Sequence, residues 1–478
     1  MSARRDVMRD GAALLLRQFV AMAAALVMTP VVARTLGAAR FGFWSLLGTT
    51  AFLLGLCDLG LTGATFRVAA DADAPAAKRA AKYCARVTAL LAIPVGLACW
   101  GWLATVAQRL PETERRDALV ATAVALAFGI LNATLQSARS YAHGRGRLVD
   151  LAMARWVGAC SQLVVTLSLL AAGMGLKAVA CGYAVMVVGE GVFSLRAARD
   201  GVEAGGPISA GEKRALHVIG RHALTTNIAV AAAMRCDVVI LERVTTLDVI
   251  GAYSVASRVV DQGFTFVKQV SGALAPRMGG RASDRDETIR RGTMALGVLA
   301  AAPLGAAAAA GAPLLVLWAG HAIDLPVLPV ALAWLAVAAA IASIDEVAGS
   351  SLFLSGEPSM AARTVLAGAV LNVLISLVGS RFVGPAAVAA GTAFGNLLTA
   401  TMVWTTFVGR PGWPARTVAA TLAPPLVALV VASGAARALA HTVLHPIALL
   451  VASTALGVAA ALVAARELNP GTKQVHAQ

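Results

Sequence analysis

The stretch "VVARTLGAARFGFWSLL", residues 31–47, places Arg34 and Arg40 between two long apolar runs. Apolar blocks of this kind recur along the chain, each about 20 residues long, which is the length an α-helix needs to cross a hydrocarbon core of about 30 Å. Hydrophobic residues make up 58% of the chain and charged residues only 14%. A soluble domain carries about 25% charged residues. The composition therefore predicts an all-α polytopic membrane protein.

Fourteen windows have the length and apolarity of a transmembrane helix: 11–33, 43–66, 86–107, 118–138, 151–172, 176–195, 216–241, 249–275, 292–318, 327–354, 361–380, 385–408, 417–438 and 444–465. Continuous apolar runs favour helices over the alternating strands of an outer-membrane barrel. With the N-terminus inside, 27 of the 40 Lys and Arg residues fall at the inner ends of the windows and nine at the outer ends. This bias predicts that both termini are cytoplasmic.

The opening stretch has a counterpart 209 residues later, "LERVTTLDVIGAYSV" at 241–255. The aligned pairs are Arg34 and Arg243, Gly42 and Gly251, Trp44 and Tyr253, and Ser45 and Ser254. Both segments join consecutive spans, the first to the second and the seventh to the eighth, although four matches alone are also compatible with chance. The repeat favours two six-helix lobes, as in duplicated transporters. The expected parts are an N-lobe at 1–200, a cytoplasmic linker at 201–215, a C-lobe at 216–408, and a helix pair with a cytoplasmic tail at 409–478.

The eighth window carries polar residues along one side. The residues that recur at steps of three or four are Ser254, Arg258, Asp261, Thr265, Lys268 and Gly272. An ionisable group at membrane depth costs at least about 2.5–3.5 kcal/mol on insertion scales, so this face should line a polar cavity. The alternative is that Arg258 and Asp261 form an internal pair that only neutralises itself.

Two more arginines are expected in the same cavity. Arg17 in the first window and Arg67 at the end of the second would join Arg258, Asp261 and Lys268 in a cationic lumen. Such a lumen suits a phosphate or another acidic group, because arginine gives bidentate contacts to it. For Arg17 the alternative is a side chain that snorkels to the inner interface.

Arg34 and Arg243 fall at the outer ends of the first and seventh windows. One interpretation is an outer gate that pairs with acidic groups in one conformation, and the other is a pair of interfacial anchors. Asp58 and Asp237 lie within apolar windows and are candidate sites for a proton or a cation. Gly60 and Gly63, close to Asp58, would allow either close packing or a break near the end of the second span.

No motif points to an enzyme or to a primary pump. The chain lacks GxxxxGK[ST], HExxH and GxSxG, and no loop is large enough for a soluble catalytic domain. The six cysteines form no CxxC pair, and the net charge of +15 follows the positive-inside bias rather than a nucleic-acid-binding pattern. We therefore expect a transporter without catalytic residues, cofactor or metal, driven by a Na⁺ or H⁺ gradient or by the membrane potential.

Four segments together resemble the polysaccharide-export flippases, the oligosaccharide or O-antigen branch of the superfamily that also holds MATE multidrug extruders and lipid II flippases. They are "PVVARTLGAARFGFWSLL" (30–47), "DLGLTGATFR" (58–67), "RCDVVIL…IGAYSVASRVV…ALAPRM" (235–278) and "LFLSGEPSM…AVAAGTAF" (352–394). The resemblance implies a V-shaped, two-lobed bundle in a bacterial inner membrane. Its cargo would be an undecaprenyl-diphosphate-linked oligosaccharide, moved to the outer leaflet by alternating access, and a polysaccharide polymerase and a chain-length regulator would be its partners.

The resemblance also implies a cation site. Sodium-coupled relatives hold a cation between helices that match the seventh, eleventh and twelfth spans, and the corresponding residues here are Asp237, Asn372, Ser376 and Thr392. Ser376 departs from the pattern, because a carboxylate there would bind a cation better, so coupling to a proton or to the membrane potential stays open. The alternatives to the proposed cargo are a cation-coupled multidrug extruder and a lipid II flippase.

Overall fold

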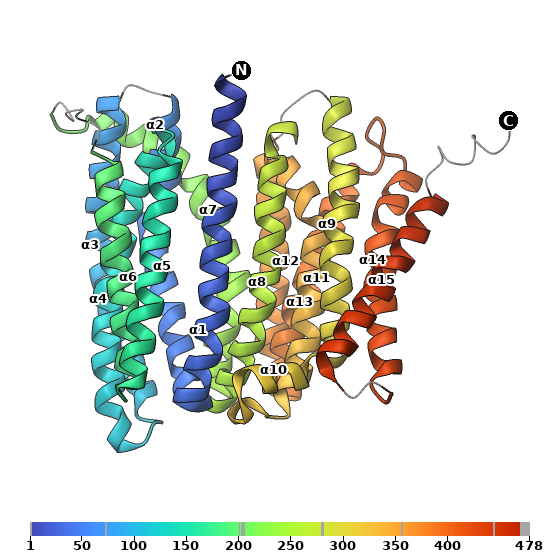
Figure 1. The fold of residues 1–478 in the computed structure, drawn as a ribbon. Coiled ribbons are helices and arrows are strands. Elements are labelled where there is room, and N and C mark those ends of the chain that lie inside the picture. The colour runs from blue at the N-terminus through green and yellow to red at the C-terminus, as the bar shows by residue number, and fades with distance from the viewer. Residues whose placement is uncertain are drawn as a thin grey trace. The chain divides into compact units, whose positions relative to one another are not determined.

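The computed structural model describes residues 2–71, 74–199, 201, 206–278, 282–354, 357–442 and 445–468, in which helices dominate and no β-strand occurs (Figure 1). Two compact units divide the chain, Met1–Ala231 and Ala232–Gln478. The predicted all-α polytopic class is confirmed. The division falls within a helix that begins at Ala210, so part of the expected linker is helical, and the predicted lobe boundaries stay predictions.

The first unit contains six complete helices, a short 3₁₀ turn and the beginning of a seventh helix. In chain order these are α1 (Ser2–Gly55), η1 (Leu56–Asp58), α2 (Leu61–Asp71), α3 (Ala74–Ala107), α4 (Glu112–Gly144), α5 (Leu148–Ala171), α6 (Leu176–Ala197) and the first part of α7 (Ala210–Val244). α5 packs against α6, and α4 packs against both α3 and α6.

The second unit contains the end of α7 and all of the later helices. These are α8 (Leu247–Met278), α9 (Ala282–Ala310), α10 (Ala312–Ala319), η2 (His321–Ile323), α11 (Val327–Leu354), α12 (Pro358–Val383), α13 (Pro385–Phe407), α14 (Ala415–Leu439) and α15 (Pro446–Leu468). α11 packs against α8, α9 and α13, while α14 packs against α9 and α15. The end of the expected cytoplasmic tail, residues 469–478, lies outside the described residues.

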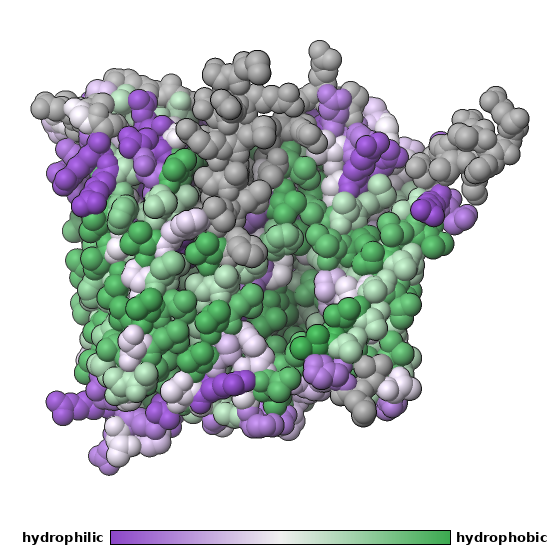
Figure 2. All heavy atoms as spheres, in the orientation of Figure 1, coloured by the Kyte–Doolittle hydropathy of each residue, from purple (hydrophilic) through white to green (hydrophobic). Residues whose placement is uncertain are grey.

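Eleven of the described helices are long and apolar enough to cross a membrane, or twelve when a bent helix pair within α7 counts as one span. All fourteen windows fall on helices. The first two windows are merged in one candidate span, Val20–Asp58, and α8 is not among the candidates because the charged residues of its polar face make it too hydrophilic. Large apolar side chains such as Leu90 (71% exposed) point outward. Figure 2 shows apolar residues along the middle of the helices and hydrophilic residues gathered at their two ends, as expected for membrane-spanning segments.

The stretch at residues 31–47 changes direction at a single residue. Gly37 has φ 76° and ψ 169°, a conformation that glycine adopts readily and other residues rarely do. The position 209 residues later, Thr246, lies between the end of α7 at Val244 and the start of α8 at Leu247. The chain therefore breaks its helix at matching positions of the two repeated segments.

A second break interrupts the chain after η1. Leu59 and Gly60 both have positive φ, 54° and 74°, and α2 begins directly afterwards. A Cβ atom on Gly60 would lie 2.2 Å from the carbonyl oxygen of Gly220 on α7. This glycine therefore allows the backbone of the break and the first part of α7 to touch within the first unit.

Glycines also set the distance between α12 and α13. A Cβ atom on Gly395 would lie 2.6 Å from the carbonyl oxygen of Gly368, and one on Gly391 would lie 2.5 Å from Oγ of Ser376. In a membrane, small residues let helices approach closely enough for van der Waals contact and interhelical hydrogen bonds. Their close packing brings Ser376 and Asn372 of α12 against α13.

Replacing Gly395 with alanine should destabilise the protein, because the added methyl group overpacks the α12–α13 interface, at a typical cost of about 1–3 kcal/mol. Thermal unfolding in detergent micelles measures the effect as a lower Tm. Gly434→Ala on α14 is the matched control, because a Cβ atom at Gly434 meets nothing within 4 Å. An equal Tm for the two variants would contradict the packing argument.

Candidate functional site

A buried carboxylate lies at the centre of the second unit's polar interior. Asp237, on α7, is only 5% exposed. Its Oδ2 atom accepts a hydrogen bond of 2.5 Å from the hydroxyl of Tyr253 on α8 and one of 2.7 Å from Oγ1 of Thr392 on α13. The thiol of Cys236 lies 3.5 Å from its Oδ1 atom. Side chains from three helices therefore converge on one carboxylate.

α12 adds two side chains to this cluster. The hydroxyl of Ser376 donates to Oδ1 of Asn372 over 3.1 Å, and Nδ2 of Asn372 lies 3.9 Å from the sulfur of Cys236. Asn372 is 2% exposed and Ser376 is fully buried. We call Asp237, Tyr253, Thr392, Cys236, Asn372 and Ser376 the Asp237 cluster.

The donors around Asp237 are neutral, and within the described part of the chain no ion pair joins Asp237 to a Lys or Arg. An ionised carboxylate in a low-dielectric interior is costly unless a proton or a cation neutralises it. Hydroxyl, amide and carboxylate oxygens are the ligands that hard cations prefer. The arrangement can therefore hold either a proton or a small cation next to Asp237.

The structure thus brings together four of the five residues expected at a coupling site, namely Asp237, Asn372, Ser376 and Thr392. Their role in ion coupling stays a prediction. Sequence reasoning missed Cys236 as a member, and it noticed Tyr253 only as the repeat partner of Trp44. Tyr253 directly precedes Ser254, where the polar face of α8 begins, and this position is the signal that could have identified it.

Asp58, the fifth expected residue, has a different environment in the first unit. Its Oδ1 atom accepts a hydrogen bond of 2.8 Å from the Gly60 N–H, and its Oδ2 atom accepts one of 3.2 Å from the Thr62 N–H and another from the Thr62 hydroxyl. The contact to Gly60 is that of an Asx turn, and the contacts to Thr62 reach the first turn of α2. Asp58 therefore starts α2 after the break, and its proposed part in ion coupling stays untested.

The polar face of α8 carries a group of three charges. Asp261 is held by the Ser257 hydroxyl at 3.4 Å, and it interacts electrostatically with Arg235 of α7 more strongly than with Arg258 of its own helix. Arg235 and Arg258 in turn repel each other. The expected internal pair of Arg258 and Asp261 is therefore part of a larger charged group that also includes Arg235, and Asp237 acts electrostatically on Asp261 as well.

Lys268, farther along α8, faces acidic partners that the sequence did not reveal. It attracts Asp345 and Glu346, two adjacent carboxylates on α11, and its ammonium lies 5.5 Å from the centre of the Phe264 ring. Asp345 is 8% exposed, whereas Lys268 lies at the surface of the unit. This end of the α8 face is therefore acidic rather than cationic.

The other predicted arginines belong to different parts of the chain. Arg67 and Arg34 belong to the first unit and are exposed. The side chain of Arg17, on α1, lies outside the described residues. Arg243 is 75% exposed and lies 3.4 Å from its neighbour Glu242. A shared lumen and an outer gate therefore stay predictions.

The first unit holds its own buried charge. Glu190 of α6 pairs with Arg155 of α5 at 2.6 Å and with Arg139 of α4 at 3.2 Å, and its side chain is only 6% exposed. A Cβ atom on Gly158 would lie 2.4 Å from Cγ of Glu190, so α5 needs a glycine at this position. This cluster joins three helices of the first unit.

With this geometry established, the chain can be compared with known proteins. It matches the family model described as "Polysaccharide biosynthesis protein" over residues 7–279. Comparison with curated proteins gives no match.

Several solved structures share the fold. The lipid II flippase MurJ, in an inward closed conformation, is 9% identical, with a TM-score of 0.73, over 96% of this chain and 98% of that one. An inward-facing MATE multidrug resistance transporter of the MOP superfamily is 15% identical, with a TM-score of 0.65, over 81% and 92%. A MOP superfamily transporter from Pyrococcus furiosus, whose binding pocket is described as reversed in polarity, is 16% identical, with a TM-score of 0.60, over 84% and 95%.

The structural matches are too distant in sequence to show more than the fold. The family model, however, covers more than half of the chain. The chain therefore belongs to the polysaccharide biosynthesis protein family, and it has the fold of the MOP superfamily transporters.

Proposed function

We propose that the protein is a flippase that moves an undecaprenyl-diphosphate-linked oligosaccharide from the inner to the outer leaflet by alternating access, for the synthesis of a surface polysaccharide. The family match over residues 7–279 carries this proposal. The charged face of α8 supports it, because charged side chains within a membrane bundle mark transport pathways.

The positive end of the α8 face is suited to the anionic part of the cargo. Arg258 and Arg235 together outweigh Asp261, and guanidinium groups bind phosphate oxygens in a bidentate way. Lys268, Arg17 and Arg67 are the further expected contacts to the diphosphate and the sugars. The prenyl chain would stay in the lipid, where its apolar surface costs nothing to accommodate.

The Asp237 cluster would couple transport to an ion gradient. A proton or a Na⁺ ion at Asp237 neutralises its charge, and its loss restores that charge within a low-dielectric interior. Ser376 contributes a hydroxyl where a second carboxylate would strengthen cation binding. A proton therefore fits this site as well as Na⁺ does.

The setting follows from the same proposal. A lipid-linked cargo places the protein in the bacterial inner membrane, with both termini in the cytoplasm according to the distribution of Lys and Arg. The function would be transport without a covalent step. The polymerase and the chain-length regulator of the polysaccharide would be its partners.

One observation favours a second candidate, a cation-coupled multidrug extruder. The charged groups described above on the C-terminal part of α7, on the polar face of α8 and on α11 are four carboxylates, Asp237, Asp261, Asp345 and Glu346, against Arg235, Arg258 and the exposed Lys268. An excess of acid suits a cationic compound better than a diphosphate. A lipid II flippase remains the third candidate, since MurJ shares the fold.

A deletion strain distinguishes these candidates. Under the flippase proposal, undecaprenyl-linked glycans accumulate in the inner leaflet and surface polysaccharide is lost. Chemical analysis of the accumulated glycan identifies the cargo, and lipid II in its place would move the protein to the third class. Unchanged lipid-linked glycans together with new sensitivity to cationic dyes would support the extruder and overturn the flippase.

Arg258→Ala should reduce complementation of the deletion strain at least tenfold, because the cargo loses a charged hydrogen-bond donor whose contribution is about 1.5–3 kcal/mol. Lys268→Ala, at the other end of the same face, should also reduce complementation. Arg437→Ala, at an exposed position in the last turn of α14, is the control and should complement fully. Full activity of both α8 variants at normal expression would disprove a role of this face in transport.

Thr392→Val should weaken the ion dependence of transport, because it removes one of the two hydroxyls that donate to Oδ2 of Asp237. Asp237→Asn, which no longer exchanges a proton, should abolish that dependence. The readout is transport into inverted vesicles under an imposed proton or Na⁺ gradient. Thr401→Val, at an exposed position of the same helix, is the control, and normal ion dependence of Asp237→Asn would remove the cluster from the coupling mechanism.

A further inference from the structure

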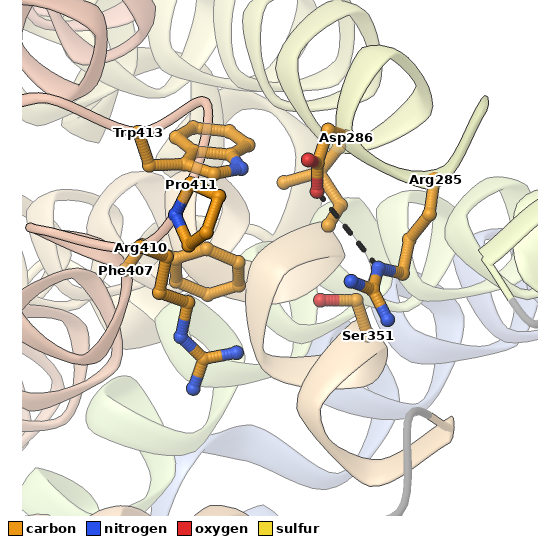
Figure 3. Close-up of a pocket in the computed structure, with 8 residues that line it drawn as sticks. Arg285, Asp286, Ser351, Phe407, Arg410, Pro411 and Trp413 are labelled. Atoms are coloured by element: carbon orange, nitrogen blue, oxygen red, sulfur yellow. Dashed lines mark ion pairs between the residues drawn. The ribbon is translucent and has the colours of Figure 1, made fainter. Parts of the chain in front are cut away.

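A pocket of about 240 Å³ lies at one end of the helices of the second unit (Figure 3). It is formed where α9 begins and where α11 and α13 end, together with the loop that leads to α14. Its lining includes Arg285, Ser351, Phe407, Arg410 and Trp413. None of these residues belongs to the Asp237 cluster or to the α8 face.

The wall of this pocket is built into the fold. Gly409 and Gly412 have φ of 88° and 82°, and the Gly409 N–H donates to the carbonyl of Trp413 over 3.1 Å. The tight loop that results presses Trp413 against Phe407, with ring centres 5.2 Å apart. Trp413 also belongs to a buried apolar cluster with Ile289 and Trp404. The aromatic wall is therefore rigid and does not depend on a ligand.

The indole of Trp413 presents a donor that lacks an acceptor. The residue is 2% exposed, and its Nε1 atom is buried without a hydrogen-bond partner. Figure 3 shows this nitrogen on the side of the ring that faces Asp286 across the pocket. Because an unpaired buried N–H group costs free energy, the geometry calls for an acceptor atom in the pocket.

The charged groups of the lining leave further donors available. Nε of Arg285 is 3.8 Å from Oδ1 of Asp286, too long for a hydrogen bond. Arg410 uses Nε for the carbonyl of Thr406 and Nη2 for Glu357, at 2.6 and 2.8 Å, which leaves its Nη1 atom. The lining contains two arginines and one aspartate, and Glu357 beside it balances Arg410, so the argument for an anion depends on the available donors and not on a net positive charge.

We propose that this pocket binds a phosphate group, with Arg285, Arg410 and the Trp413 N–H as donors. Two guanidinium groups and one neutral N–H match the several acceptor oxygens of a phosphate, and the aromatic wall accommodates the carbon atoms attached to it. The source is either the headgroup of an anionic phospholipid or a free phosphate ion. This pocket is separate from the cargo contacts proposed above, and its function does not depend on what the protein transports.

The position of the pocket favours the lipid source. It lies at helix ends, where Figure 2 shows hydrophilic residues next to the apolar band. Basic pockets between transmembrane helices at that level bind anionic headgroups, and Trp and Arg are the residues enriched at that depth. A bound headgroup would join α9, α11 and the loop before α14.

The test uses the full-length protein in detergent micelles and three probes: short-chain phosphatidylglycerol, short-chain phosphatidylcholine and inorganic phosphate. Binding is measured by microscale thermophoresis. We expect phosphatidylglycerol to bind more tightly than phosphatidylcholine, and Arg285→Gln to weaken its binding about tenfold, as expected for the loss of one charged donor. Trp413→Phe should weaken it several-fold, because it removes the N–H and keeps an aromatic ring in the wall.

Arg381→Gln, at an exposed position in the last turn of α12, is the control and should bind phosphatidylglycerol as the wild type does. Binding of inorganic phosphate alone, with the same loss in Arg285→Gln, identifies free phosphate as the source, whereas binding of phosphatidylglycerol alone identifies the headgroup. Measurable and equal binding of the two lipids, unchanged phosphatidylglycerol binding in both pocket variants, or no binding of any of the three probes would overturn the proposal. Trp413→Phe carries the test if Arg285→Gln does not fold.

Discussion

Inside a hydrocarbon layer every charge and every backbone polar group must find its partner within the protein, and this constraint explains most of the structure. Asp58 accepts hydrogen bonds from backbone N–H groups at the start of a helix, and Glu190 forms ion pairs with two arginines. The partners described for Asp237 are two hydroxyls and a thiol, all of them neutral. Asp58 and Glu190 therefore have charged or backbone partners within the first unit, whereas the described surroundings of Asp237 contain no cationic hydrogen-bond donor.

Hydrophobic periodicity depends only on residues close together in the sequence, and it was sufficient to predict where the helices lie. The apolar blocks predicted an all-α membrane bundle. The spacing of Arg258, Asp261 and Lys268 identified α8 as a helix with a polar face, although hydropathy alone would not select it as a membrane span. The repeat aligned Thr246 with Gly37, the two points at which the chain breaks its helix. The membership of Asn372 and Thr392 in one cluster came from the family resemblance instead, since no spacing within one helix relates them.

Partners on neighbouring helices could not be predicted in this way. A helical pattern shows which residues share a face, but it does not show which helix covers that face. The pattern on α8 offered Asp261 as a partner for Arg258, but it did not show that Arg235 of α7 also acts on Asp261. It likewise did not show that Lys268 attracts Asp345 and Glu346 of α11.

α7 begins in the first unit and ends in the second, and polar contacts hold it near both ends. Near its start, Glu212 is fixed by a capping box with Ser209 and by an ion pair with Arg79 of α3, and Gly220 touches the break after η1. Near its end, the same helix carries Asp237, whose hydroxyl partners come from α8 and α13. Neutralising Asp237 weakens the hydrogen bonds that it accepts from Tyr253 and Thr392, because bonds to a charged acceptor are stronger than bonds to a neutral one.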